Sequence, residues 1–175
     1  MEIIKTYLEG LVIIKPKVFK DKRGYFMESY KESFMKENFP DTHFIQDNES
    51  SSRFGVLRGL HFQKPPFEQT KLVRVIVGKI QDVVVDLRNG SKTYGKYYSV
   101  ILSDSNKKQL FVPKGFAHGF LTLSKNAIVS YKVDVDYNPK SESGIIFNDF
   151  NINISWRLKN KEIKVSRKDS RLLNF

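Results

Sequence analysis

Val73–Leu87 (VRVIVGKIQDVVVDL) is the stretch that decides the fold. Two runs rich in valine and isoleucine lie on either side of Gly78-Lys79. β-Branched residues favour strands, and a glycine between two such runs is typical of a tight turn. The stretch therefore predicts a central β-hairpin whose strands are Val73–Val77 and Ile80–Leu87.

Short runs of the same kind continue along the chain after this hairpin. The further strands that we expect are Lys96–Ser103, Gln109–Val112, Phe116–Leu123 and Ala127–Val133. Turn signals that recur every 8–12 residues or so are typical of an all-β sandwich or barrel. Helical patterns are few: Tyr30–Asn38 is one, and Ser166–Leu173 opens like a capping box. The sequence predicts one domain over residues 1–175, an antiparallel jelly-roll barrel with short helices near its ends.

The composition excludes several classes of protein. The 175 residues include no cysteine, which removes disulfides, thiolate metal sites and cysteine nucleophiles. The first residues (MEIIKTYLEGLVIIKPK) contain Glu2 and Glu9 and lack a long apolar core, so we expect no signal peptide. No apolar run approaches the ~20 residues of a membrane helix. A reducing cytoplasm is the expected location.

The net charge of +11 points to an anionic partner, which could be a nucleic acid, a membrane surface or a phosphorylated small molecule. The densest basic stretch, Arg157–Arg171, has the pattern of a solvated surface. The chain contains no zinc-finger, basic-zipper or RNP pattern. A nucleic-acid binder is therefore a disfavoured alternative, and we expect neither a nucleic acid nor a membrane as partner.

Two of the three histidines lie in unusual settings. His118 stands in Pro113–Phe120 (PKGFAHGF), which resembles the second motif of the cupin superfamily. Metal-binding cupins have His-x-His in their first motif, whereas this chain has His61-Phe62-Gln63. Two imidazoles alone make a poor site for a first-row metal. We therefore expect a cupin-like barrel that holds no metal.

Residue types alone leave the roles of the candidate side chains open. His61 and His118 could be core histidines, and Tyr131 could be part of the barrel wall. Lys71 could be a solvated lysine at a strand end, and Asp169 could cap a helix. Each of these structural interpretations competes with a role in acid–base chemistry.

An ordered set of motifs narrows the choice. They are Asp21–Glu28 (DKRGYFME), Gln46–Ser51 (QDNESS), Gly55–Gln63 (GVLRGLHFQ), Lys71–Val75 (KLVRV), Asp82–Arg88 (DVVVDLR), Ser91–Gly95 (SKTYG), Pro113–Phe120, Tyr131-Lys132, Tyr137–Glu142 (YNPKSE) and Ser166–Asp169 (SRKD). In this order they resemble the nucleotide-sugar 3,5-epimerases whose type member is dTDP-4-dehydrorhamnose 3,5-epimerase. The resemblance implies a cupin jelly roll, a homodimer, no metal or organic cofactor, and work in surface-polysaccharide synthesis.

The resemblance also implies a chemistry and its residues. The substrate is a nucleoside-diphosphate 4-keto-6-deoxyhexose whose C3 and C5 protons are acidified by the C4 carbonyl. His61 is the implied base, Asp169 its hydrogen-bond partner and Tyr131 the acid on the far face of the sugar. Lys71 would stabilise the enolate. His118 would contact the sugar or a phosphate.

Further positions match substrate-binding residues of the family. Arg23 and Arg58 suit the diphosphate because a guanidinium can form two parallel bonds to phosphate oxygens, and Lys168 could assist. The remaining matches, most of them on the nucleotide side, are Phe26, Glu28, Gln46, Asn48, Tyr137 and Glu142. An aromatic ring that stacks on a base tolerates different bases, so these matches leave the nucleotide open.

Small departures from the family pattern keep alternatives open. Phe62 stands where the family often has tyrosine, and Phe147–Phe150 (FNDF) is a loose version of Trp-Asn-Asp-Pro. The alternatives are an enzyme that inverts only C3 or only C5, and an epimerase of a GDP- or CDP-linked sugar, including a heptose. From another class, the chain could be a cupin-like module that binds a sugar nucleotide without turnover.

Overall fold

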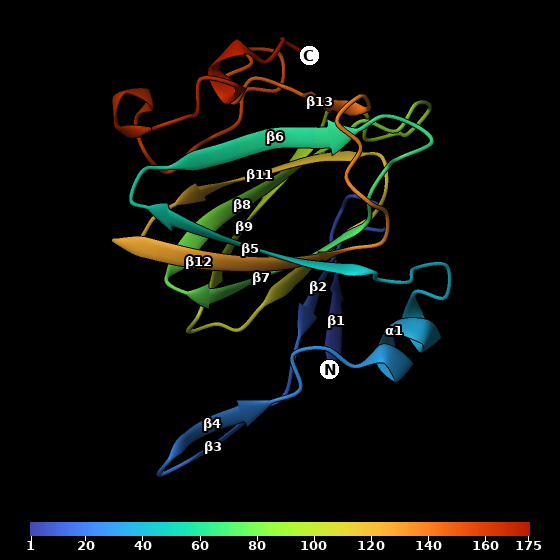
Figure 1. Cartoon of the computed structure of the whole chain (residues 1–175), viewed down its shortest axis with the longest axis vertical. Helices are drawn as coiled ribbons and strands as arrows, with labels where there is room; N and C mark the ends of the chain where they lie inside the picture. Colours follow the sequence, from blue (N-terminus) through green and yellow to red (C-terminus); the bar gives the residue numbers. More distant parts are fainter.

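The computed structural model describes residues 1–175, and two antiparallel sheets form the body of the molecule (Figure 1). One sheet has six strands in the order β1 (Glu2–Lys5), β2 (Val12–Lys15), β10 (Gln109–Val112), β7 (Lys71–Val77), β12 (Asn126–Val133) and β5 (Gln46–Arg53). The other has five in the order β13 (Glu142–Gly144), β6 (Leu57–Gln63), β11 (Phe116–Thr122), β8 (Lys79–Asp86) and β9 (Tyr97–Ser103). This is the predicted all-β jelly-roll architecture.

The predicted central hairpin is wrong, although both of its strands are present. β7 pairs with β10 and β12, whereas β8 pairs with β9 and β11 in the other sheet. The turn at Gly78 therefore carries the chain from one sheet to the other. Gly78 has φ +84°, and a Cβ there would lie 2.2 Å from the carbonyl oxygen of Asn126, so only glycine fits. A period of two identifies a strand but does not identify its neighbours.

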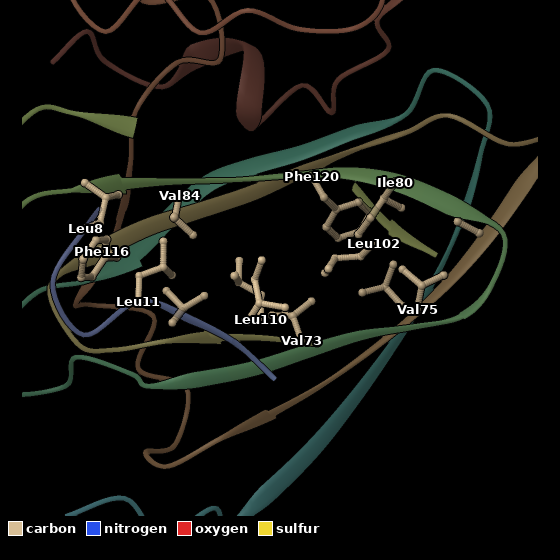
Figure 2. Packing of buried hydrophobic residues seen from close by; sticks show 14 residues of the cluster. Leu8, Leu11, Val73, Val75, Ile80, Val84, Leu102, Leu110, Phe116 and Phe120 are labelled. Atoms are coloured by element: carbon tan, nitrogen blue, oxygen red, sulfur yellow. The ribbon is translucent and has the colours of Figure 1, made fainter. Parts of the chain in front are cut away.

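The main core lies between the two sheets (Figure 2). Its 14 buried residues include Leu8 and Leu11 from the loop between β1 and β2, which Figure 2 shows beside Phe116 at one end of the core. Neither β5 nor β6 contributes a residue to this cluster. The inner faces of these two strands are therefore free to line a polar cleft.

Each sheet also has a cover on its outer face. The outward side chains Val83 and Val85 of β8 pack with Ile152 and Ile154 of the segment after β13. Because β8 is buried on both faces, its apolar residues Ile80 and Val83–Val85 pack into the clusters on both sides of the sheet. On the six-stranded sheet, helix α1 (Glu32–Asn38) packs Met35 against a smaller buried cluster.

Of the two predicted helices, the structure confirms one. α1 confirms the first of them, with a start at Glu32 instead of Tyr30. The second is wrong in extent, because the C-terminal segment contains only the single-turn 3-10 helices η1 (Asn160–Glu162) and η2 (Asp169–Arg171). The Asp169 N–H donates to Ser166 Oγ at 3.0 Å, as the cap pattern predicts. Leu173 then forms a bridge with Ile145, and this pairing ends the helix after one turn.

A two-stranded arm, β3 (Val18–Asp21) and β4 (Gly24–Met27), extends away from both sheets (Figure 1). Phe26 on this arm is 67% exposed and packs only loosely on Phe19, with 6.5 Å between ring centroids. Tyr25 is also exposed and accepts a hydrogen bond from Lys107 Nζ at 2.7 Å. The arm thus presents apolar rings that this chain does not cover.

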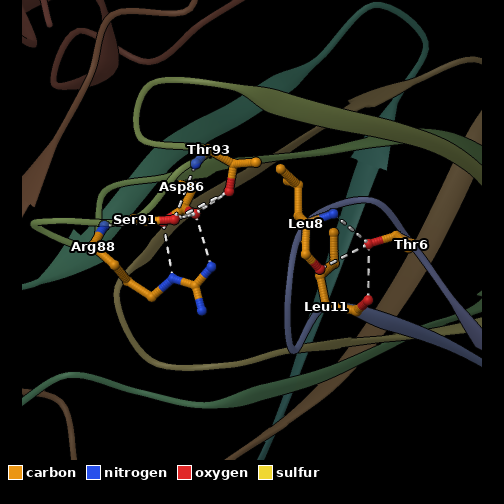
Figure 3. A network of polar contacts seen from close by, with 7 residues as sticks. All are labelled: Thr6, Leu8, Leu11, Asp86, Arg88, Ser91 and Thr93. Carbon is orange, nitrogen blue, oxygen red and sulfur yellow. Dashed lines mark hydrogen bonds and ion pairs between the residues drawn. The ribbon is translucent and has the colours of Figure 1, made fainter.

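A buried polar network fixes the loop after β8 (Figure 3). The Asp86 carboxylate accepts bonds from Arg88 Nε and Nη2 at 2.9 and 2.8 Å, and from the hydroxyls of Ser91 and Thr93 at 2.7 Å each. Burial opposes ionisation of Asp86, but the bonds from Arg88, Thr93 and Ser91 prevail and lower its pKa. On the nearby loop between β1 and β2, Thr6 Oγ1 donates to the Leu11 carbonyl at 2.9 Å. These contacts stabilise one end of the barrel.

Candidate active site

A cavity of about 550 Å³ lies between the two sheets, and a smaller one of about 340 Å³ adjoins it. His61, Lys71 and Tyr131 line both cavities. His61 comes from β6 of the five-stranded sheet, whereas Lys71 and Tyr131 come from the six-stranded sheet. The three side chains therefore reach one shared space from two sides.

His61 has the predicted carboxylate partner. Its Nε2 lies 2.8 Å from Asp169 Oδ1, although the two residues are 108 positions apart in the sequence. Asp169 is only 5% exposed, and its Oδ2 accepts a long bond of 3.4 Å from the Gly59 N–H. With the proton held on Nε2 toward Asp169, the lone pair of the ring is on Nδ1. This arrangement suits a general base.

Tyr131 stands on β12 with its ring at the edge of the main core. Burial raises the pKa of the Tyr131 phenol above its ordinary value, and the positive charge of Arg58 opposes this shift. The phenol is therefore protonated at neutral pH. Tyr131 can donate a proton from the sheet opposite His61.

Lys71 is the first residue of β7 and lies partly buried between the cavities. Burial lowers its pKa to about 8, while the negative charges of Asp82 and Glu142 oppose this shift. An ammonium group in such a site interacts strongly with a developing negative charge because little water screens it. A charged Lys71 can therefore stabilise negative charge that forms in either cavity.

His118 is held by a carboxylate that the sequence interpretation missed. Its Nε2 lies 3.0 Å from each carboxylate oxygen of Asp82, and Asp82 on β8 is fully buried. The available signal was an acidic residue directly before the apolar run Val83–Val85. A charge buried in that position needs a partner.

Two glycines bring the histidine-bearing strands together. His118 on β11 and His61 on β6 are direct cross-strand partners. A Cβ on Gly59, which has φ +121°, would lie 2.6 Å from Gly119 Cα. The close approach of β6 and β11 therefore requires glycine, and it places both imidazoles at the cavity.

Arg58 is oriented by the neighbouring strand. Its Nε donates to Ser52 Oγ at 2.9 Å, and its Nη2 donates to the Ser51 carbonyl at 3.1 Å. The guanidinium lines the larger cavity and has further N–H groups that these two bonds do not use. It can bind an anionic group at this cavity.

The smaller cavity contains three of the predicted nucleotide-side residues, Gln46, Asn48 and Tyr137, together with Glu142. Gln46 Nε2 donates to Asn48 Oδ1 at 2.7 Å, and Tyr137 is 54% exposed. Glu142 accepts bonds of 2.5 Å from the Tyr137 hydroxyl and from Lys168 Nζ. Burial works against the charge of Glu142, but Lys168 and Tyr137 lower its pKa. These contacts join the strand β13 to the segment that carries Asp169.

Three predicted binding residues lie outside both cavities. Arg23 is in the turn of the arm and pairs with Asp21 at 2.6 Å. Phe26 is exposed on β4, and Glu28 just after it forms an ion pair of 3.4 Å with Lys31. Within one chain, these residues do not join the other site residues. Their predicted roles stay predictions.

The structure contains no group of three or more His, Cys, Asp or Glu side chains that could hold a metal ion. No helix is both long and apolar enough to span a membrane. Independence from a cofactor stays a prediction.

A jelly-roll barrel with a carboxylate-paired histidine on one sheet and a tyrosine on the other belongs to the cupin-type proteins and has the groups of an acid–base isomerase. The chain belongs to the dTDP-4-dehydrorhamnose 3,5-epimerase family, whose model matches residues 5–175. The predicted family, fold and enzyme class are thereby confirmed.

Individual relatives agree with this assignment. The dTDP-4-dehydrorhamnose 3,5-epimerase of Methanothermobacter thermautotrophicus is 52% identical over 167 residues, which are 95% of this chain and 90% of the relative. The Legionella pneumophila enzyme, solved in complex with dTDP-4-keto-L-rhamnose, is 44% identical with a TM-score of 0.94 over 99% of this chain and 92% of its own. A 3'-monoepimerase from Streptomyces bikiniensis, solved with dTDP-quinovose, is 27% identical with a TM-score of 0.90 over 97% of this chain and 85% of its own.

Proposed function

We propose that the protein is a cofactor-independent 3,5-epimerase that converts dTDP-4-dehydro-6-deoxy-D-glucose to dTDP-4-dehydro-L-rhamnose. The observation that carries the proposal is the placement of His61 and Tyr131 on different sheets around one cavity. Epimerisation needs a base on one face of the sugar and an acid on the other. The higher identity to the 3,5-epimerases than to the monoepimerase supports inversion at both centres.

The first chemical step is removal of a proton from the carbon next to the C4 ketone. His61 takes the proton of C3 or C5. The electron pair of the broken C–H bond forms a double bond to C4, and the π pair of the C4 carbonyl moves to its oxygen. The Asp169 carboxylate 2.8 Å away stabilises the resulting imidazolium. Lys71, still largely charged at neutral pH, stabilises the enolate oxygen.

The second step returns a proton to the same carbon from the opposite face. Tyr131 donates its phenolic proton as the enolate collapses to the ketone, which leaves the centre inverted. Exchange with solvent then removes the proton of His61 and restores that of Tyr131. Arg58 lies where its positive charge favours the transient tyrosinate, because that charge lowers the pKa of Tyr131.

The arm suggests how Arg23, Phe26 and Glu28 could take part. We infer that two copies of the chain form a homodimer in which the arm of one copy lies beside the cleft of the other. The uncovered rings on β3 and β4 support this, since exposed aromatic clusters of this kind are typical of interfaces. Arg23 could then reach the diphosphate and Phe26 the base. Residues 1–175 act as one domain in this proposal, and a reducing cytoplasm suits a chain without cysteine.

The test is isotope exchange in D₂O with dTDP-4-keto-6-deoxy-D-glucose, followed by NMR at C3 and C5. We expect one deuteron at each centre. His61→Ala should abolish exchange yet still bind dTDP, whereas His43→Ala, a change at an exposed histidine outside both cavities, should behave as wild type. A chelator should have no effect, and clear inhibition by it would contradict the absence of a metal.

Other outcomes would replace the proposal. One deuteron in place of two would identify a single-centre epimerase. Exchange only with a GDP- or CDP-linked sugar would change the nucleotide. Tight binding without any exchange would identify a binding module.

A further inference from the structure

Strand β5 presents a row of polar side chains to the inside of the barrel. Its residues alternate between exposed positions and the less exposed positions Gln46, Asn48, Ser50 and Ser52. Three of these four have partners: Gln46 bonds to Asn48 at 2.7 Å, and Ser52 Oγ accepts from Arg58 Nε at 2.9 Å. The hydroxyl oxygen of Ser50 is buried and has no hydrogen-bond partner. A buried polar atom without a partner is uncommon in folded proteins.

The position of Ser50 relates it to the hexose end of the site. Ser50 pairs with Val129 on β12, and Asn48 pairs with Tyr131, so Ser50 and Tyr131 are diagonal neighbours on one face of the sheet. Ser50 lines the larger cavity with His61 and Tyr131. It does not line the smaller cavity, where Gln46, Asn48 and Tyr137 lie.

We propose that Ser50 is a substrate-contacting residue whose hydroxyl binds a ring hydroxyl of the hexose. The inference rests on the proposed epimerase function. A serine hydroxyl both donates and accepts, as a sugar hydroxyl does, so the two can pair in either direction. Rotation of the side chain between staggered positions can turn the hydroxyl from its covered position toward the sugar.

A contact of this kind differs from a structural one in a measurable way. In the free protein the Ser50 hydroxyl makes no bond, so its removal should not lower the melting temperature. In the complex its loss leaves a sugar hydroxyl unpaired. A neutral hydrogen bond of ordinary strength corresponds to a decrease of about 3- to 10-fold in kcat/KM.

The experiment compares Ser50→Ala with wild type and with Thr122→Val. Thr122 carries the other buried hydroxyl without a partner and lines neither cavity, so it is a matched control. We expect Ser50→Ala to lower kcat/KM for the dTDP-4-keto sugar while its melting temperature and its affinity for dTDP alone stay at wild-type values. Thr122→Val should leave kcat/KM unchanged.

Three results would overturn the assignment of Ser50. The first is an unchanged kcat/KM in Ser50→Ala, and the second is a fall in its melting temperature that accounts for the lost activity. The third is a loss of affinity for dTDP alone as large as the loss in kcat/KM, which would assign the hydroxyl to the diphosphate or the nucleoside. Failure of the proposed function is distinguishable, because wild-type protein would then turn over no dTDP-4-keto sugar.

Discussion

The charge of Lys71 should set the upper pH limit of activity. Its pKa is about 8 because burial disfavours the ammonium form. Roughly 90% of Lys71 is then charged at pH 7 and about 10% at pH 9, so kcat/KM should fall about tenfold between these two values if the ammonium is required. Tyr131 does not titrate in this range, since its pKa is raised above 10.0. kcat/KM is the appropriate quantity because it reports the groups of the free enzyme.

The assay is epimerisation of the dTDP-4-keto sugar by NMR across pH 6–10 or so. Lys71→Arg is the matched variant: a guanidinium stays charged throughout, so the fall near pH 8 should disappear even if overall activity is lower. Asp82→Asn should move the fall to lower pH, because the Asp82 charge raises the pKa of Lys71. A profile that stays flat to pH 10, or one that Lys71→Arg does not alter, would refute the requirement for the ammonium form.

Stability gives a second measurement of the same group. The pKa of Lys71 is about 8 in the folded chain, against 10.5 for an unperturbed lysine. Between these values the unfolded state binds more protons, so the free energy of unfolding should rise with pH in that window. Lys71→Met should remove this rise and should increase stability near neutral pH, as chemical denaturation can show. A rise of the same size in the variant would contradict the attribution.

Three further predictions concern other side chains. Asp169→Asn should lower kcat about 10²- to 10⁴-fold with little change in dTDP affinity, because the carboxylate that pairs with His61 is lost. Near-normal turnover in steady-state kinetics would contradict this prediction. The Tyr131→Phe variant should still exchange the substrate's proton for deuterium in D₂O, but it should form the inverted product about 100-fold more slowly. Undiminished formation of the inverted product would exclude Tyr131 as the acid. Asp86→Asn should lower the free energy of unfolding by about 2–4 kcal/mol in urea titrations, since Arg88 loses its buried partner. Because the pKa of Asp86 is lowered in the fold, wild-type stability should decline below about pH 4, and the decline should be smaller in the variant.

The six strands β7–β12 could be predicted from the sequence far better than their pairing, whereas β1–β6 and β13 were not predicted. β9, β10, β11 and β12 all lie within one or two residues of the predicted ranges. The hairpin at Gly78 was wrong because alternation describes how one strand is buried, whereas pairing depends on contacts between residues far apart in sequence. The turn itself is a real feature, but its partner strands lie in different sheets.

The same distinction applies to the site. No local pattern connects His61 with Asp169, and only the motif order suggested that pair. Asp82 is visible in the sequence as an acidic residue next to valines. Its role as the partner of His118 can be inferred only when its burial beside that histidine is known. Ser50 left no such signal, because the strand Gln46–Arg53 is polar throughout and its inward residues resemble its exposed ones. Position inside the barrel, and not residue type, distinguishes them.

The late position of Asp169 in the chain has a consequence for synthesis. Strands β1–β13 end at Gly144, so a nascent chain that has emerged that far already contains His61, Lys71 and Tyr131. It does not yet contain the carboxylate that pairs with His61. The N-terminal part of a chain emerges first during synthesis. A ribosome-bound chain arrested before Asp169 therefore has every strand of the barrel but should be deficient in turnover, and activity should report synthesis past that residue.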